Sequence, residues 1–228
     1  MNTVSGIFRS VVRSVALAAA CVVVAASASA SAAAAASEQQ FTYRVEMSPY
    51  GSIGTYRNVV QKNGGETTIT TEAHIKVSLV GVVLYRLDIA RIARRTGDRL
   101  VYFHGITDEN GTSTEVNGRA AGEQFVITSP NGRITAPGTI RPSDPWSAAV
   151  PGTSVVFMPD TGAVTRVQTS EGKETSITLN GVLMPVLRYR IATADGREQY
   201  QIWLNDRRVP VMFTIVDDSG ATTFTLAK

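Results

Sequence analysis

The sequence predicts an all-β protein, in which a single curved antiparallel meander sheet forms a half-barrel or open barrel with a crossover loop and at most one short helix. Three observations lead to this prediction. Apolar and polar residues alternate through most of the chain after residue 36, as they do in half-buried strands. Turn residues separate these runs at short intervals. No segment after residue 36 has the apolar periodicity of a helix of about ten residues or more.

The alternation is clearest in residues 67–79. One face of this segment is expected to be buried, and it carries Thr67, Ile69, Thr71, Ala73, Ile75, Val77 and Leu79. Residues 41–47 alternate in the same way. Residues 82–85 and 209–216 have apolar side chains on both faces, so both segments are expected to be covered on two sides.

A sheet that wraps one face around a lumen would cover such strands. If side chains leave that lumen open, it is a candidate site for an apolar ligand; if they fill it, the same residues form an ordinary core. The residues expected to line a ligand site are the aromatic residues Tyr85, Phe103, Trp146 and Trp203.

Short turn motifs separate the expected strands. Pairs of this kind supply the positive φ angles that tight hairpins need, and they occur at Asn63-Gly64-Gly65, Asn110-Gly111, Asn117-Gly118, Asn131-Gly132, Asn180-Gly181, Asp195-Gly196 and Ser219-Gly220. The proline-rich residues 137–159 do not alternate. This segment is expected to be the crossover, with a turn or two of helix near residues 143–149. Trp146 then either plugs the open end of the sheet or takes part in function.

Residues 1–36 are interpreted as a secretory signal peptide. Arg9 and Arg13 precede an apolar run from Val15 to Ala26, and a Ser/Ala tract with small-x-small sites follows, which is the order found in such signals. The run is shorter than the roughly 20 residues needed to span a bilayer, and no later segment is long and apolar enough to do so. We expect cleavage after Ala36, a single antiparallel β domain over residues 37–228, and a periplasmic location, with an extracellular one as the alternative.

Charge and cysteine content narrow the chemistry. Removing Arg9 and Arg13 from the 22 Lys and Arg leaves 20, against 19 Asp and Glu. A balance of +1 gives no reason to expect a nucleic-acid partner. The one cysteine, Cys21, lies inside the signal. A lipid anchor at Cys21 is the less favoured interpretation, and without one the mature domain has no thiol for disulfides, catalysis or metal binding.

Two enzyme hypotheses remain as alternatives. Asp160-Thr161-Gly162 follows an apolar run, as in aspartic peptidases, but a single such tripeptide would need a homodimer to bring two carboxylates together. The second hypothesis is a hydrolase that uses His104 with a nearby acid. His104 is more simply a hydrogen-bonded strand residue, and His74 a solvent-facing one. The histidine spacing matches no metal site, so neither a metal nor a cofactor is expected.

Five arginines gather between residues 86 and 99. Their spacing puts Arg86 and Arg94 on one strand face and Arg91, Arg95 and Arg99 on the other. The favoured interpretation is a solvated hairpin tip with ion pairs across the strands, and the alternative is a contact for acidic lipid headgroups or an acidic partner.

Several strings together resemble a family of exported Gram-negative envelope proteins known only as a domain of unknown function. They are Gly81-Val82-Val83-Leu84-Tyr85-Arg86, Thr107-Asp108-Glu109-Asn110-Gly111-Thr112, the loop around Trp146, Thr161-Gly162 and Ile202-Trp203. That family is similar to periplasmic half-barrels that carry lipoproteins between membranes. The resemblance implies a curved antiparallel sheet in the envelope, without an established activity, cofactor or catalytic residue.

The leading hypothesis is therefore a non-catalytic periplasmic β-protein. Its expected partner is an apolar small molecule or lipid, or else an envelope protein. A purely structural envelope module that docks through a strand edge is a third reading, beside the two hydrolases.

Overall fold

The computed structural model describes residues 36–147, 154–194, 196, 199–217 and 220–227. Residues 34–228 form one compact unit. The described residues contain strands and turns but no helix, so the predicted all-β class is confirmed. The predicted signal peptide lies outside the described residues, apart from Ala36.

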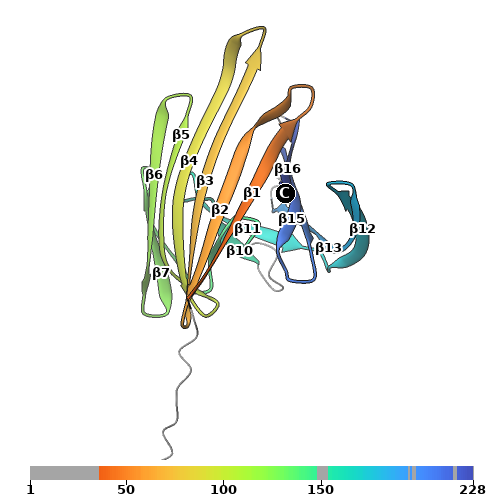
Figure 1. Ribbon diagram of the computed structural model, residues 1–228. Coiled ribbons are helices and arrows are strands. Elements are labelled where there is room, and N and C mark those ends of the chain that lie inside the picture. The colour runs from red at the N-terminus through yellow and green to blue at the C-terminus, as the bar shows by residue number, and fades with distance from the viewer. Residues whose placement is uncertain (1–35, 148–153, 195, 197–198, 218–219, 228) are drawn as a thin grey trace, which may run out of the picture. The chain divides into compact units, whose positions relative to one another are not determined.

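Sixteen strands form one sheet in the described part of the chain (Figure 1). They are β1 (Ser37–Met47), β2 (Gly51–Asn63), β3 (Glu66–Leu79), β4 (Val82–Thr96), β5 (Arg99–Glu109), β6 (Thr112–Ala121), β7 (Gln124–Ser129), β8 (Gly132–Pro137), β9 (Arg141–Pro142), β10 (Val155–Phe157), β11 (Val164–Thr169), β12 (Lys173–Leu179), β13 (Val182–Thr193), β14 (Gln199–Leu204), β15 (Pro210–Asp217) and β16 (Gly220–Leu226).

The predicted antiparallel meander is confirmed, in two halves. Strands β1 to β8 pair in chain order, and so do β13 to β16. The halves are joined by antiparallel pairing of β1 with β16, in a register that places Tyr43 opposite Leu226. One edge of β13 pairs with β12 and, further along, with β11. The pair β9–β10 is parallel, so the sheet is mostly, but not wholly, antiparallel.

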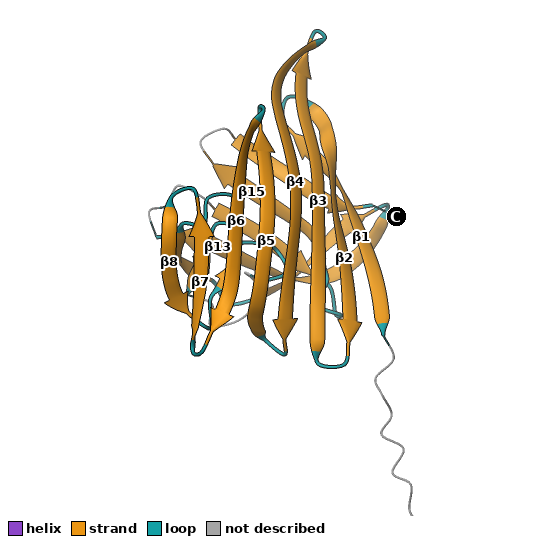
Figure 2. Ribbon diagram, turned by 90° about the vertical axis from the view of Figure 1, so that its left-hand side faces the viewer, coloured by secondary structure: helices purple, strands orange, loops and turns teal. Residues whose placement is uncertain are grey.

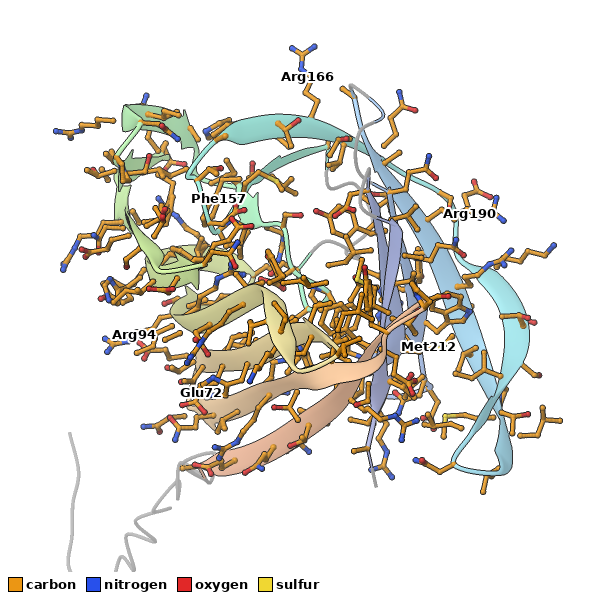
Figure 3. All side chains as sticks on the ribbon, turned by 90° about the horizontal axis from the view of Figure 1, so that it is seen from above. Glu72, Arg94, Phe157, Arg166, Arg190 and Met212 are labelled. Atoms are coloured by element: carbon orange, nitrogen blue, oxygen red, sulfur yellow. The ribbon has the colours of Figure 1, made fainter. Side chains whose placement is uncertain are left out.

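The sheet is open, with β8 and β9 at the two ends of the strand order. It curves, however, so that the far end of the order packs against the first half (Figure 3). Phe157 of β10 is fully buried, and its ring lies 5.0 Å from that of Phe103 and 6.1 Å from that of Phe125. Residues 138–154 connect β8 to β10, which places the crossover where it was predicted. In its described part, residues 143–147 form bends and turns rather than helix.

The main core follows the predicted alternation. In β3, the residues Ile69, Thr71, Ala73, Ile75 and Val77 are buried. Opposite them, an aromatic group joins the two halves of the sheet: Tyr43, Tyr56, Phe213 and Phe224 have ring centroids 4.2 to 5.8 Å apart. The Tyr43 hydroxyl donates a hydrogen bond to the carbonyl oxygen of Pro210 at 2.7 Å, so this buried polar group is satisfied.

A smaller cluster covers the C-terminal strands from the other side. Val186 and Val211 pack there with Trp203, which lies opposite Met212 of β15. The next residue of β15, Phe213, lies opposite Ile202, and both belong to the main core. The prediction that residues 209–216 contact apolar groups on two sides is therefore confirmed.

The same prediction is wrong for residues 82–85. Val82, Val83 and Leu84 are 62%, 48% and 51% exposed, because the strand pairs on both sides of the hairpin stop short of them. Strand β2 pairs with β3 only as far as Ile75, and β5 pairs with β4 only from Leu87.

Of the predicted turns, Asn110-Gly111 and Asn180-Gly181 are tight turns with positive φ at both residues. Gly64-Gly65 also form a turn, whereas the turn predicted at Asn131-Gly132 lies one residue earlier, at Pro130-Asn131. Asp195 and Ser219 lie outside the described residues. The turn predicted at Asn117-Gly118 is wrong, because both residues lie within β6. Gly118 serves packing there: a Cβ at this position would lie 2.4 Å from a ring carbon of Phe125.

This close contact predicts that Gly118→Ala destabilises the domain by about 2–3 kcal/mol, because the Phe125 ring must move within a packed core. Urea unfolding measures the change. Gly65→Ala is the matched control, since a Cβ there meets nothing within 4 Å. Equal stability of the two variants would show that Gly118 is not needed for packing.

Candidate functional site

A cavity of about 390 Å³ lies beneath Trp146, where the β2–β3 hairpin, the end of β4 and the loop between β14 and β15 meet. This volume falls within the range of about 300–1,000 Å³ typical of ligand sites. The apolar part of its wall consists of Val60, Ile69, Pro145, Trp146, Leu204 and Val209. Gln39, Thr67 and Gly97 complete the wall together with five charged residues.

The charged residues around the cavity are mostly cationic. Lys62, Arg95, Arg207 and Arg208 line it together with one acid, Asp98. Arg95 is half-buried, and the other three cations are exposed, so these three form a rim around an interior that is only partly apolar. An arrangement of this kind suits a ligand that has an apolar body and an anionic end.

Local hydrogen bonds fix the rim. The Asn205 side-chain oxygen accepts from the backbone N–H groups of Arg207 and Val209, at 3.1 and 2.9 Å. Arg208 adopts a left-handed backbone conformation with φ of 59°, and its N–H donates to the Asn205 carbonyl at 2.9 Å. The backbone of this loop is therefore ordered before any ligand arrives.

The crossover covers the cavity through Trp146, whose ring lies 4.8 Å from that of Phe41. Asp144 holds this segment, because one carboxylate oxygen accepts from the Trp146 N–H at 2.9 Å and the other accepts from the Ser147 hydroxyl at 3.0 Å. Two buried donors at the cavity, Trp146 Nε1 and Arg95 Nε, have no acceptor among the described residues.

Arg95 and Asp144 are coupled through Ser147, whose hydroxyl oxygen accepts a hydrogen bond from Arg95 Nη2. Burial raises the pKa of the Asp144 carboxyl, against the opposing effects of Arg95 and of the hydrogen bonds from Ser147 and Trp146. Burial likewise lowers the pKa of the Arg95 guanidinium, and Asp144 opposes that shift. Desolvation is thus the largest influence on both groups.

A second arginine lies deeper, on the same face of β4. Arg91 stands between Ile89, which packs on the main core, and Ala93, which belongs to the cluster around Phe103. Its Nη2 donates to the Thr107 hydroxyl at 3.3 Å, and burial lowers its pKa while Tyr56, Asp160 and Asp144 raise it. The prediction of a solvated hairpin tip is therefore wrong for Arg91 and Arg95. Their spacing was the signal that could have been used: Arg91 and Arg95 lie two residues from Ile89 and Ala93, so all four share the enclosed face of the strand.

The four aromatic residues predicted to line a site lie in different places. Trp146 lines the cavity, and the other three do not. Phe103 is buried in the cluster around Phe157, while Trp203 packs in the small cluster on the other side of β14. Tyr85 is half-buried near the far end of β4, where burial and then Glu109 raise its pKa to about 12. The rim residues Lys62, Arg207 and Arg208 were not anticipated.

The residues of the hydrolase alternatives do not form a catalytic arrangement that the structure supports. Asp160 lies in a turn, and its buried Oδ1 accepts no hydrogen bond from the described residues. His104 contacts Asn117 Oδ1 through Nδ1 at 2.9 Å, with Glu115 at 3.6 Å. In the described part of the chain, no group of three or more His, Cys, Asp or Glu residues could hold a metal ion. Nor does that part contain a helix that is long and apolar enough to cross a membrane.

Burial of Asp144 predicts a pH dependence of stability. The folded state binds the proton of the Asp144 carboxyl more tightly than the unfolded chain does. This stabilising contribution is full below the unfolded pKa of about 3.9, and it is lost as the pH rises through the folded pKa. The free energy of unfolding should therefore fall with rising pH in the wild type relative to Asp144→Asn. Urea unfolding at a series of pH values measures this difference. The exposed Glu174→Gln is the control, and a difference that stays constant or grows with pH would contradict the prediction.

Comparison with known proteins identifies a solved structure of similar fold and a matching family. No curated protein matches the sequence. Among solved structures, a β-barrel-like protein of domain of unknown function DUF1849 from Brucella abortus is similar in fold, with a TM-score of 0.60 and 16% sequence identity over 83% of this chain and 95% of that one. The family described as Domain of unknown function (DUF6134) matches residues 43–227, which include at least part of every strand and almost all of the cavity wall. The chain belongs to this family of domains of unknown function.

Proposed function

We propose that the domain is a non-catalytic binding protein of the periplasm that holds an amphiphile with an apolar body and an anionic end. The observation that carries the proposal is the cavity beneath Trp146, because its lining combines apolar residues with four cations and a single acid. The location rests on the signal sequence predicted in residues 1–36.

The wall and the rim would bind different parts of one molecule. Val60, Ile69 and Leu204 are buried residues of the wall, and they would contact the apolar part of the ligand, whose removal from water contributes roughly 25 cal/mol per Å². Lys62, Arg207 and Arg208 would stay at the solvent edge and bind the anionic end through charge-assisted hydrogen bonds.

Arg95 also lines the cavity, at the boundary between wall and rim. Its guanidinium would donate charge-assisted hydrogen bonds to a carboxylate or phosphate oxygen of a ligand. A purely apolar ligand would not make these bonds, so the cavity favours an amphiphile over a hydrocarbon.

The remaining interior supports binding at this end of the sheet rather than throughout a hollow lumen. Two buried clusters fill the middle, one around Tyr43 and Phe213 and the other around Phe103 and Phe157. An envelope protein that docks on the rim is the second candidate partner, because an acidic segment would match its charge.

A fluorescent ligand assay tests the proposal. A dansyl-labelled fatty acid should bind with increased fluorescence, and its methyl ester, which lacks the charge, should bind at least about tenfold more weakly. Arg207→Gln should reduce affinity for the acid while leaving affinity for the ester unchanged. Arg166→Gln is the matched control, because Arg166 is exposed and points away from the curve of the sheet (Figure 3).

Native mass spectrometry of protein purified from an envelope extract provides a second measurement. We expect an added mass of amphiphile size that is lost on delipidation, with a change in Trp fluorescence because Trp146 lines the cavity. An unliganded mass, combined with no binding of either dansyl probe, would reject ligand carriage. Retention of one envelope protein in the same preparation would then favour the docking alternative.

A further inference from the structure

The hairpin between β3 and β4 ends in an exposed apolar tip. Its members are Leu79 (55% exposed), Val80 (95%), Val82 (62%), Val83 (48%) and Leu84 (51%). Hydrophobic residues scattered singly over a surface are ordinary, whereas a contiguous group of this kind marks an interaction site. We name these five residues the apolar tip.

The tip projects beyond the rest of the sheet (Figure 2). The neighbouring strands stop at Ile75 on one side and Leu87 on the other, and Arg86 still exchanges hydrogen bonds with Asn110. Residues 76–85 therefore form a two-stranded ribbon that extends beyond the paired strands on both sides. A register shift between Val77 and Ser78 places a bulge opposite them in β4, which brings Val82, Val83 and Leu84 to the surface together.

The turn at the end of the tip contains an apolar residue in a conformation that disfavours it. Val80 has φ of 49° and is followed by Gly81 with φ of 82°. The same chain uses Asn-Gly for the two turns of matching geometry, at Asn110-Gly111 and Asn180-Gly181, and asparagine tolerates positive φ far better than a β-branched residue does. A strained and almost fully exposed valine stabilises neither the turn nor the core, which leaves its apolar side chain available for a contact outside the domain.

The charges around the tip indicate the partner. Lys76 and Arg86 lie directly opposite each other at the base of the ribbon. No Asp or Glu occurs from Ala73 to Leu87, and the acids that act on Arg86 are Asp88 and Asp108. Arg86 Nε donates to Asp88 at 2.7 Å, yet the Arg86 side chain remains 66% exposed. An apolar end with a collar of two cations matches a lipid surface, where apolar side chains enter the acyl boundary and cations meet anionic headgroups.

The geometry points to membrane docking: the apolar tip inserts into the surface of a bilayer that contains anionic lipids, with Lys76 and Arg86 at headgroup level. A second copy of the chain fits the tip less well, because five side chains at a narrow end fall short of the roughly 20–30 residues per side of a stable interface. A partner protein with a flat surface would contact the unpaired edges of the ribbon rather than the tip.

The proposed docking site is separate from the cavity. Thr67 and Arg95 line the cavity at one end of β3 and β4, and the tip lies 12 residues further along β3, or about 40 Å at the rise of an extended strand. Docking at the tip therefore leaves the cavity mouth free. Because the two sites are separate, a variant can lose membrane binding and keep amphiphile binding, or the reverse.

Vesicle flotation tests this inference. The protein should float with vesicles of phosphatidylcholine and phosphatidylglycerol, and to a smaller extent with phosphatidylcholine alone. A variant combining Val80→Asn, Val82→Thr and Val83→Thr should reduce binding at least about tenfold, since it removes three apolar contacts. Val80→Asn by itself should raise Tm, because it places a favoured residue in the turn, and still weaken binding. This stabilised variant separates lost docking from lost folding.

The charge collar and the place of contact need their own measurements. Lys76→Gln with Arg86→Gln should abolish the preference for phosphatidylglycerol, whereas Arg94→Gln, an exposed arginine lower on β4, should preserve it. Hydrogen exchange of residues 76–86 should slow in the presence of anionic vesicles, which reports the hairpin independently of the N-terminal segment.

Unchanged exchange in residues 76–86, or equal flotation of the wild type and the triple variant, would overturn the inference. A wild type that dimerises without vesicles, and becomes monomeric on Val80→Asn, would show instead that the tip binds a second copy. Binding of the dansyl probe by the triple variant is expected to be normal in every case.

Discussion

The antiparallel pairing of β1 with β16 is the constraint on which the rest of this structure depends. It joins the meander of β1 to β8 to the meander of β13 to β16. The rings of Tyr43 and Tyr56 from the first meander pack there against Phe213 and Phe224 from the second. The cavity has the same dependence, because Val60 and Ile69 come from one meander while Leu204 and Val209 belong to the other. Pairing the first strand with the last closes a loop that contains nearly the whole domain, which costs conformational entropy. The packing of the four buried aromatic rings between the two meanders offsets that cost.

Local patterns in the sequence predicted the parts of the fold that local physics controls. Period-two alternation identified the buried face from Ile69 to Val77, because a strand with one buried face cannot shift its register by one residue. Errors arose where distant residues decide the outcome. Asn117-Gly118 has the composition of a turn, yet Gly118 is needed where the Phe125 ring crosses β6. Residues 82–84 carry the composition of a covered strand, but the neighbouring strands end before them.

The candidate site was harder to predict than the fold, because its residues come from segments far apart in the chain. Trp146 could be singled out as a tryptophan in a long proline-rich loop. Its partners could not: Asp144 orders the loop through hydrogen bonds, and Asn205 orders the rim from almost 60 residues further along. The five arginines between residues 86 and 99 were evident in the sequence. Which of them are exposed and which are enclosed depends on the face of β4 that packs on the core. Desolvation of Arg95 and Asp144 is a property of that packing and has no counterpart in the sequence.

The lengths of β3 and β4 connect the two ends of the domain. These strands have 14 and 15 residues, whereas β5 has 11, and their extra length pairs with nothing but each other. A free two-stranded ribbon is marginally stable and exposes edges that other chains can pair with, so core packing does not account for it. The extra length of β3 and β4 is explained if the ribbon serves to hold the apolar tip beyond the edge of the sheet. The opposite ends of the same strands line the cavity. The two ends of β3 and β4 thus carry the tip proposed to dock on lipid and part of the cavity proposed to bind an amphiphile.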